Sequence, residues 1–154
     1  MPQCGIVDLN SVTSRSYAAD ASKDKISKEF ANQHRALEKL KKKADYIEQA
    51  LSDNPTLNES ERLQLSSELA QLYINIHSSE DELNSKIQKR RDDYRLFLLD
   101  YYLQILNAKS KTDGIDIVFS KNGALLINRK KTTDINCGSS FIDYTDFVVR
   151  ITNR

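Results

Sequence analysis

Apolar residues recur at alternating steps of four and three between residues 26 and 51. The positions are Ile26, Phe30, Gln33, Leu37, Leu40, Ala44, Ile47 and Leu51, and Gln33 is the one polar residue among them. Two apolar positions per heptad place a narrow stripe along one side of a helix, which is typical of a coiled-coil seam. This spacing predicts a helix over 22–52 that packs against another helix through the stripe.

A second stripe begins after a predicted turn over 52–58. A proline with Asp and Asn residues beside it favours the turn, and Asn58 is placed to cap a helix that starts with Glu59. The second stripe comprises Leu65, Leu69, Leu72, Ile76, Glu80, Leu83, Ile87, Arg90, Tyr94, Phe97 and Tyr101. A second helix over 59–111 after so short a turn predicts an antiparallel helical hairpin. The heptad spacing shifts at Glu80, so we expect the supercoil to unwind and the hairpin to bend there.

Short apolar segments near both ends of the chain predict strands. Residues 5–9 are rich in β-branched side chains and predict one strand, with a helix cap at Asn10 and Ser11 after it. Residues 115–119 and 124–128 flank an Asn-Gly turn, so they predict a β-hairpin. These strands account for the β structure that we expect.

The remaining C-terminal residues are predicted to form a loop over 129–142 and a helix over 147–152 that residues 143–146 cap. Before them, the second long helix is apolar around most of its circumference beyond residue 93, so we expect it to be buried on several sides. This core is the expected place of Tyr94, Tyr101 and Tyr102.

Three short strands do not cover their own apolar faces, and both faces of these strands carry apolar residues. We therefore expect several copies to pool their strands in a shared core of closed symmetry. The expected oligomer core contains Ile6, Val7, Leu9, Ile115, Ile117, Phe119, Leu125, Leu126 and Ile127. The predicted fold class is α+β and mostly α. Residues 5–20 and 91–154 form a small β body that oligomerisation completes, and residues 21–90 form a coiled-coil hairpin arm that projects from it with a tip near 53–58.

Composition and charge restrict the function. The 23 basic and 22 acidic residues leave a net charge of +1, which does not favour a nucleic-acid partner. The sequence contains no phosphate-binding loop and no nucleophile motif, so we expect no enzymatic activity and no cofactor. His34 and His77 fall on different helices without further ligands at metal-binding spacing, so we expect no metal site.

The two cysteines, Cys4 and Cys137, are too few for a disulfide framework, and two separate thiols or one disulfide both fit the sequence. The sequence contains no apolar run of transmembrane length and no secretory signal. We therefore expect either a cytosolic protein or one whose signal peptide lies outside this sequence.

In its order of elements the chain resembles the Skp (OmpH-like) family of periplasmic chaperones over residues 5–154. The resemblance lies in Ile6-Val7-Asp8, Lys28-Glu29-Phe30, the segments 114–119 and 122–127, and the segment 143–148. It implies a homotrimer whose strands build a body and whose hairpins surround a cavity. That cavity would hold unfolded outer-membrane proteins in the periplasm without ATP. Family arms are usually basic, whereas the tip here carries Asp53, Glu59 and Glu61 against Arg62.

Two basic clusters are the candidate client-binding positions. They contain Lys39, Lys41, Lys42 and Lys43, and Lys86, Lys89, Arg90, Arg91 and Arg95. A positive lining would attract acidic unfolded chains, and Arg90 falls on the seam itself, where a charge needs a partner or an open cavity. The alternative is that these residues solvate the coiled coil and form intrahelical pairs, such as Asp92 with Arg95.

The expected partners are unfolded outer-membrane proteins and further copies of the chain, with a weak contact to a membrane surface. Several flexible arms that each bind weakly would together hold an unfolded chain, which is the mechanism of an ATP-independent holdase. Two other functions fit the sequence. One is a tethering coiled coil that binds a folded partner, and the other is a cytosolic, prefoldin-like chaperone.

Overall fold

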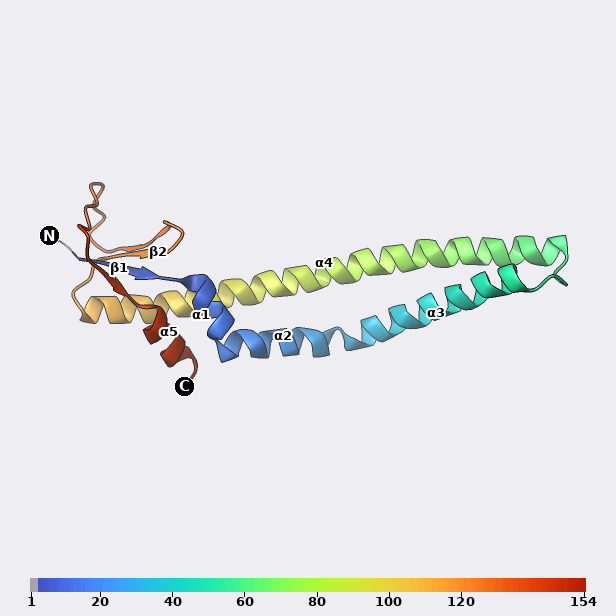
Figure 1. Ribbon diagram of the computed structural model, residues 1–154, viewed down its shortest axis with the longest axis horizontal. Coiled ribbons are helices and arrows are strands. Elements are labelled where there is room, and N and C mark those ends of the chain that lie inside the picture. Colours follow the sequence, from blue (N-terminus) through green and yellow to red (C-terminus); the bar gives the residue numbers. More distant parts are fainter. Residues whose placement is uncertain (1–2) are drawn as a thin grey trace. The chain divides into compact units, whose positions relative to one another are not determined.

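The computed structural model describes residues 3–154, which divide into two units (Figure 1). The sheet unit consists of the chain up to Asp24 together with Asp93–Arg154, and the hairpin unit is Lys25–Asp92. Five helices and one four-stranded sheet make up the described chain. The predicted α+β, mostly α class is therefore confirmed.

The sheet has the strand order β3-β2-β1-β4. Its strands are β1 (Cys4–Val7), β2 (Ile117–Ser120), β3 (Leu125–Asn128) and β4 (Phe141–Asp143). β1 is parallel to both of its neighbours, while β2 and β3 form the predicted antiparallel hairpin, with a bulge beside Val118. The loop predicted over 129–142 is wrong at its end, because β4 lies there. Three residues are too short to show a strand pattern, and pairing with β1 creates this strand.

Two short helices, α1 (Leu9–Arg15) and α5 (Thr145–Thr152), pack in the sheet unit. Asp8 caps α1, since its Oδ1 accepts a hydrogen bond from the Ser11 N–H over 3.1 Å. The cap predicted at Asn10 and Ser11 is therefore two residues too late. The Thr145 N–H at the start of α5 donates to Asp143 Oδ1 over 2.9 Å. The N-cap residue is Tyr144, which makes no side-chain capping hydrogen bond, and α5 begins at Thr145 rather than at the predicted residue 147.

The core of the sheet unit lies between the sheet and these helices, with the C-terminal part of α4 (Glu59–Thr112) also packed into it. Its buried members include Val7, Val12, Leu98, Tyr102, Leu106, Ile115, Val118, Tyr144 and Val148. The seam predicted at Phe97 and Tyr101 is wrong, because their exposed fractions are 68% and 38%. The buried positions shift by one residue, to Leu98 and Tyr102, because here α4 packs in a sheet core rather than in a two-helix seam.

The hairpin unit is an antiparallel pair formed by α3 (Ala31–Asp53) and the first part of α4 (Figure 1). The seam buries the predicted residues Ile26, Phe30, Leu37, Ala44, Ile47, Leu72, Ile76 and Leu83. Asn58 caps α4 as predicted, since its Oδ1 accepts the Glu61 N–H over 2.8 Å. The long second helix and its turn are therefore confirmed.

The first predicted helix over 22–52 is wrong in its continuity. The chain forms α2 (Tyr17–Glu29) and α3 instead, and Phe30 interrupts them with φ of −102° and ψ of 8°. The buried Phe30 ring stays in the seam, so packing holds the interruption without a Gly or Pro to signal it. α4 is continuous through Glu80, where we expected a bend.

Candidate assembly and client-binding surfaces

The two faces of the sheet differ in their cover. Gly5, Val118, Ile127 and Ile142 are register partners across the four strands, so the side chains of the last three lie on the same face of the sheet. This face packs on the core, and Val118 is fully buried. Here the Tyr144 ring lies so close to β1 that a Cβ at Gly5 would meet its Cε2 atom at 2.6 Å.

The opposite face, which we call the outer sheet face, carries the apolar residues Ile6, Phe119, Leu125 and Phe141, and the exposed Asp143 lies beside Ile6 on β4. Ile6 and Phe119 are half-buried, and the exposed fractions of Leu125 and Phe141 are 45% and 47%. None of these four residues belongs to the core beneath the sheet. Within the described chain, the outer sheet face is therefore an apolar surface that the protomer covers only in part.

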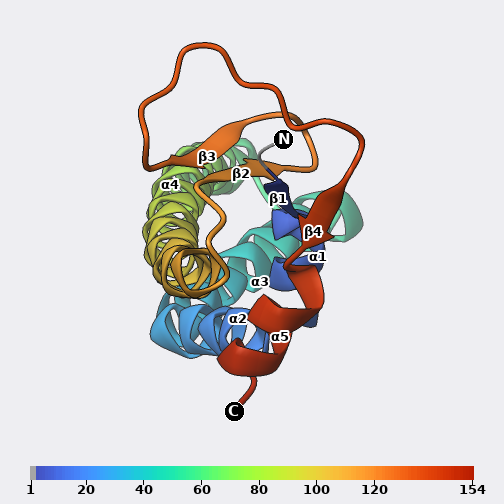
Figure 2. The same ribbon diagram turned by 90° about the vertical axis from the view of Figure 1, so that its left-hand side faces the viewer.

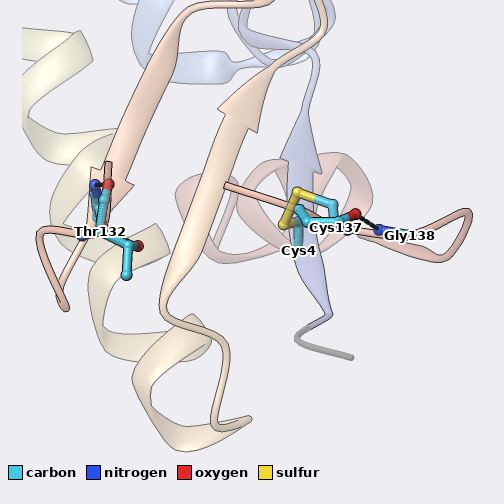
Figure 3. The surroundings of a disulfide bond; sticks show 6 residues. Cys4, Thr132, Cys137 and Gly138 are labelled. Atoms are coloured by element: carbon cyan, nitrogen blue, oxygen red, sulfur yellow. Dashed lines mark hydrogen bonds between the residues drawn. A yellow bond between two sulfur atoms is a disulfide. The ribbon is translucent and has the colours of Figure 1, made fainter. Parts of the chain in front are cut away.

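A disulfide fastens the segment 129–140 to this side of the sheet. Figure 3 shows Cys137, in the loop between β3 and β4, joined to Cys4 on β1. The two Cα atoms are 5.3 Å apart and Cys4 is fully buried. The loop arches over the side of the sheet away from α5 (Figure 2). Of the two alternatives that the sequence allowed, the structure has the disulfide.

The predicted oligomer-core residues divide between the two faces. Val7 and Ile115 are buried in the protomer's own core, and Leu9, Leu126 and Ile127 pack against that core in part. Ile6, Phe119 and Leu125 lie together on the outer sheet face, and Ile117 shares their strand parity but is only 6% exposed. Phe141 was not among the predicted residues, because β4 was not predicted.

Several of the predicted client-binding cations form ion pairs. Lys41 Nζ lies 2.9 Å from Glu80 Oε1, and this hydrogen bond raises the pKa of Lys41. Lys43 pairs with Glu68 over 3.4 Å. Lys39 and Lys42 are exposed, and no carboxylate in residues 3–154 lies within 4 Å of their ammonium groups. Two of the four lysines of this α3 cluster, Lys41 and Lys43, therefore form ion pairs that link α3 to α4.

The α4 cluster shows the same division. Arg90 pairs across the hairpin with Glu29 over 2.7 Å, and Lys86 pairs with Glu82 one turn away over 2.9 Å. Lys89 and Arg91 are exposed, without a carboxylate within 4 Å in the described chain. Arg95 belongs to the sheet unit, whereas the other eight cations belong to the hairpin unit.

Exposed apolar side chains of the hairpin unit were not among the predicted sites. They are Tyr46, Leu63, Tyr73 and Ile74, with exposed fractions of 74%, 72%, 46% and 62%. The Tyr73 hydroxyl donates to Glu48 Oε2 over 3.1 Å, which raises the pKa of Tyr73. The other three are apolar positions outside the seam spacing, and that departure is the sequence signal that could have found them.

The described residues show two further features that bear on function. None of their helices combines the length and apolarity needed to cross a bilayer. No group of three or more His, Cys, Asp or Glu side chains in residues 3–154 is arranged to hold a metal ion.

The chain thus combines a long antiparallel helical hairpin in one unit with a small mixed sheet in the other, and the outer face of that sheet is only partly covered. Comparison with protein families then matches residues 3–149 to the family described as Outer membrane protein (OmpH-like). The chain belongs to the OmpH-like family, which confirms the resemblance in the sequence. Members of this family are periplasmic chaperones rather than enzymes; they bind unfolded outer-membrane proteins and are oligomeric. A comparison with curated proteins gave no match.

Proposed function

We propose that the chain is an ATP-independent holdase that binds unfolded outer-membrane proteins during their passage through the periplasm. The observation that carries this proposal is the family match, which covers nearly the whole chain, including both long helices and all four strands. A holdase needs no catalytic group, because many weak contacts from several arms suffice to retain a client.

The compartment in this proposal rests on the disulfide. Disulfides persist in oxidising compartments such as the periplasm and are rare in cytosolic proteins. The Cys4–Cys137 bond therefore favours the periplasm over the cytosol of a prefoldin-like chaperone. A signal peptide encoded upstream of this sequence would agree with this location.

The assembly in this proposal rests on the outer sheet face. Copies of the chain, three in the favoured arrangement, would bury Ile6, Phe119, Leu125 and Phe141 against one another. Residues 5–20 and 91–154 would then form the oligomerisation body, and residues 21–90 would form the arm. Apolar residues that the protomer leaves half exposed are the expected material of such an interface.

Charge has a secondary role in the proposed client capture. Lys39, Lys42, Lys89 and Arg91 are exposed and would steer acidic clients towards the arm. The cations Lys41, Lys43, Lys86 and Arg90 would contribute less to this attraction, because the carboxylates they pair with offset their charge. Arg95 is the ninth cation of the proposed client-binding set.

An aggregation assay tests the proposed function. A urea-unfolded outer-membrane β-barrel protein is diluted into buffer with and without this protein, and the turbidity is followed without ATP. Near-stoichiometric amounts of the protein should keep the client soluble. If the client aggregates equally in both samples, the holdase function is wrong, and the chain would instead be a coiled-coil tether for a folded partner.

A further inference from the structure

The Cys4–Cys137 disulfide holds a segment of the sheet unit that few other contacts hold. This segment, residues 133–140, lies between β3 and β4, and we call it the strap. Within the described chain, residues 133–139 make no hydrogen bond or ion pair with residues outside the strap. Ser140 accepts a hydrogen bond of 3.4 Å from the exposed Gln3 side chain. The position of the strap therefore depends largely on the disulfide.

The chain is anchored on both sides of the strap without the help of the disulfide. Before the strap, the Asn128 side chain donates to the Thr132 carbonyl oxygen over 3.0 Å and accepts from the Thr132 N–H over 3.3 Å. After the strap, the Tyr144 N–H donates to the Ile6 carbonyl oxygen over 2.8 Å. Cleavage of the disulfide can therefore free the strap while the segments on either side of it keep their places.

One part of the outer sheet face lies beneath the strap. Cys4 and Ile117 have the strand parity of Ile6 and Phe119, so their side chains point to this face. Their exposed fractions are 0% and 6%, although neither belongs to the core on the other side of the sheet. The strap arches over this side of the sheet (Figure 2), and the disulfide joins it to Cys4 (Figure 3). We attribute the burial of these two side chains to the strap.

The covered part of the outer sheet face adjoins an open part. Phe141, the register partner of Cys4 on β4, has an exposed fraction of 47%, and that of Leu125 on β3 is 45%. Displacement of the strap would therefore add Cys4 and Ile117 to an apolar surface that is already half open. The position of the strap decides how much apolar surface the sheet presents.

The two sulfurs of the disulfide differ in their access to a reaction partner. Cys4 is fully buried in the sheet, whereas Cys137 is half-buried and lies between the exposed residues Asn136 and Gly138. A disulfide is opened by a thiolate that attacks one of its two sulfurs, and access decides which sulfur is attacked. The fold therefore favours attack at Cys137 and makes Cys4 the leaving group.

We propose that the Cys4–Cys137 bond is a site of thiol–disulfide exchange, at which a dithiol oxidoreductase attacks Cys137 and releases the strap from the outer sheet face. The partner is defined by its chemistry, which is one nucleophilic cysteine thiolate with a second, resolving cysteine beside it. The proposal goes beyond the holdase function and does not depend on it. It makes the apolar area of the outer sheet face depend on the redox state of one bond.

The exchange proceeds in two steps. The partner's thiolate bonds to Cys137 Sγ, the bond between the two sulfurs of this chain breaks, and its electron pair goes to Cys4 Sγ, which takes up a proton. The partner's second thiolate then attacks its own first sulfur, so the partner gains a disulfide and Cys137 leaves and takes up a proton. Two electrons and two protons have passed from the dithiol to this chain, and the reverse exchange closes the strap again.

Trapping of the mixed disulfide tests which sulfur reacts. The oxidised full-length chain is incubated with a thioredoxin whose resolving cysteine is replaced by serine, so that the second step cannot occur. Trypsin places Cys4 in peptide 1–15 and Cys137 in peptide 132–150, which mass spectrometry distinguishes. We expect at least about tenfold more adduct on peptide 132–150 than on peptide 1–15, because of the difference in access. A thioredoxin without either cysteine is the control and should give no adduct.

The distribution of the adduct decides between the alternatives. An adduct on Cys4, or equal amounts on both cysteines, would overturn the assignment of Cys137 as the reacting residue. No adduct with the folded chain would show that the bond is a structural link closed to exchange, and would overturn the proposal as a whole.

Alkylation of the thiols tests whether the strap opens. The unaltered protein is reduced with a phosphine and given a short pulse of iodoacetamide, and the same two peptides are compared. We expect Cys4 to be labelled at a rate within about tenfold of that of Cys137, because release of the strap uncovers it. A Cys4 that stays unlabelled while Cys137 reacts would show that the strap remains in place, and would overturn the proposal.

A buried reporter separates release of the strap from unfolding of the sheet unit. Val12 is fully buried in the core on the other side of the sheet. In the variant Cys4→Ser/Cys137→Ser/Val12→Cys, the new thiol should stay unlabelled under the same pulse, because the core remains closed without the disulfide. Labelling of this thiol as fast as Cys4 would mean that loss of the bond opens the whole unit, and would overturn a local release of the strap.

Discussion

Removal of the Cys4–Cys137 disulfide should lower the stability of the protein substantially. The bond joins residues separated by 133 positions, so it removes a large loop-closure entropy from the unfolded chain. The chain-entropy relation gives about 5 kcal/mol for a loop of this length, and measured effects are commonly about 2–4 kcal/mol. Since domains are stable by only about 5–15 kcal/mol, we expect the double variant Cys4→Ser/Cys137→Ser to lose a large part of its stability.

Urea unfolding measures this loss at a fixed protomer concentration. With a slope of about 1–3 kcal/mol per molar urea, a loss of about 3 kcal/mol moves the midpoint down by about 1–3 M. Dithiothreitol should lower the midpoint of the unaltered protein and leave that of Cys4→Ser/Cys137→Ser unchanged. If reductant and double substitution both leave the midpoint where it was, the proposed role of the bond in stability is wrong.

Three further variants test the sheet unit. Gly5→Ala should destabilise the protein by about 1–3 kcal/mol, because the new Cβ would meet the Tyr144 ring at 2.6 Å. Thermal unfolding measures this loss, and an unchanged melting temperature would contradict the packing. Burial and the hydrogen bond to Asp113 raise the pKa of Tyr144 in the folded protein. Because the unfolded chain ionises this phenol at a lower pH, the free energy of unfolding should fall as the pH rises above about 10. Tyr144→Phe should weaken that pH dependence, and an identical alkaline profile would refute the assignment. Leu125→Asp/Phe141→Asp should lower the mass of the proposed oligomer in light scattering, because charges on the outer sheet face would oppose its burial. An unchanged oligomer mass would place the interface elsewhere.

The hairpin was predictable because its determinants are local. The four-three spacing from Ile26 to Leu51 specifies a seam, and the Asn58 side chain caps the helix that follows it. The Asn-Gly turn between β2 and β3 has the same local character. Each of these signals depends on neighbours within one or two turns of the chain.

The features that were not predicted depend on contacts between distant residues. β4 exists because Phe141–Asp143 pairs with β1, more than 130 residues earlier in the sequence. The shift of the buried face to Leu98 and Tyr102 depends on the sheet core against which α4 packs. The interruption at Phe30 has no breaking residue, so its sequence looks like an uninterrupted seam.

In the sequence, the candidate client-binding positions are recognisable only by their positive charge. Four of the nine cations selected from the sequence form ion pairs within the hairpin unit, as Lys41 does with Glu80 and Arg90 with Glu29. The exposed apolar side chains Leu63 and Ile74 were missed because they fall outside the seam spacing.

The central claim is that an oligomer of this chain retains an unfolded outer-membrane protein without ATP. Size-exclusion chromatography with light scattering tests it directly, after a urea-unfolded β-barrel protein is diluted into a solution of the protein. The account predicts one soluble peak that contains both proteins, with a mass equal to the oligomer plus the client. A pelleted client, with this protein eluting alone at its original mass, would contradict it.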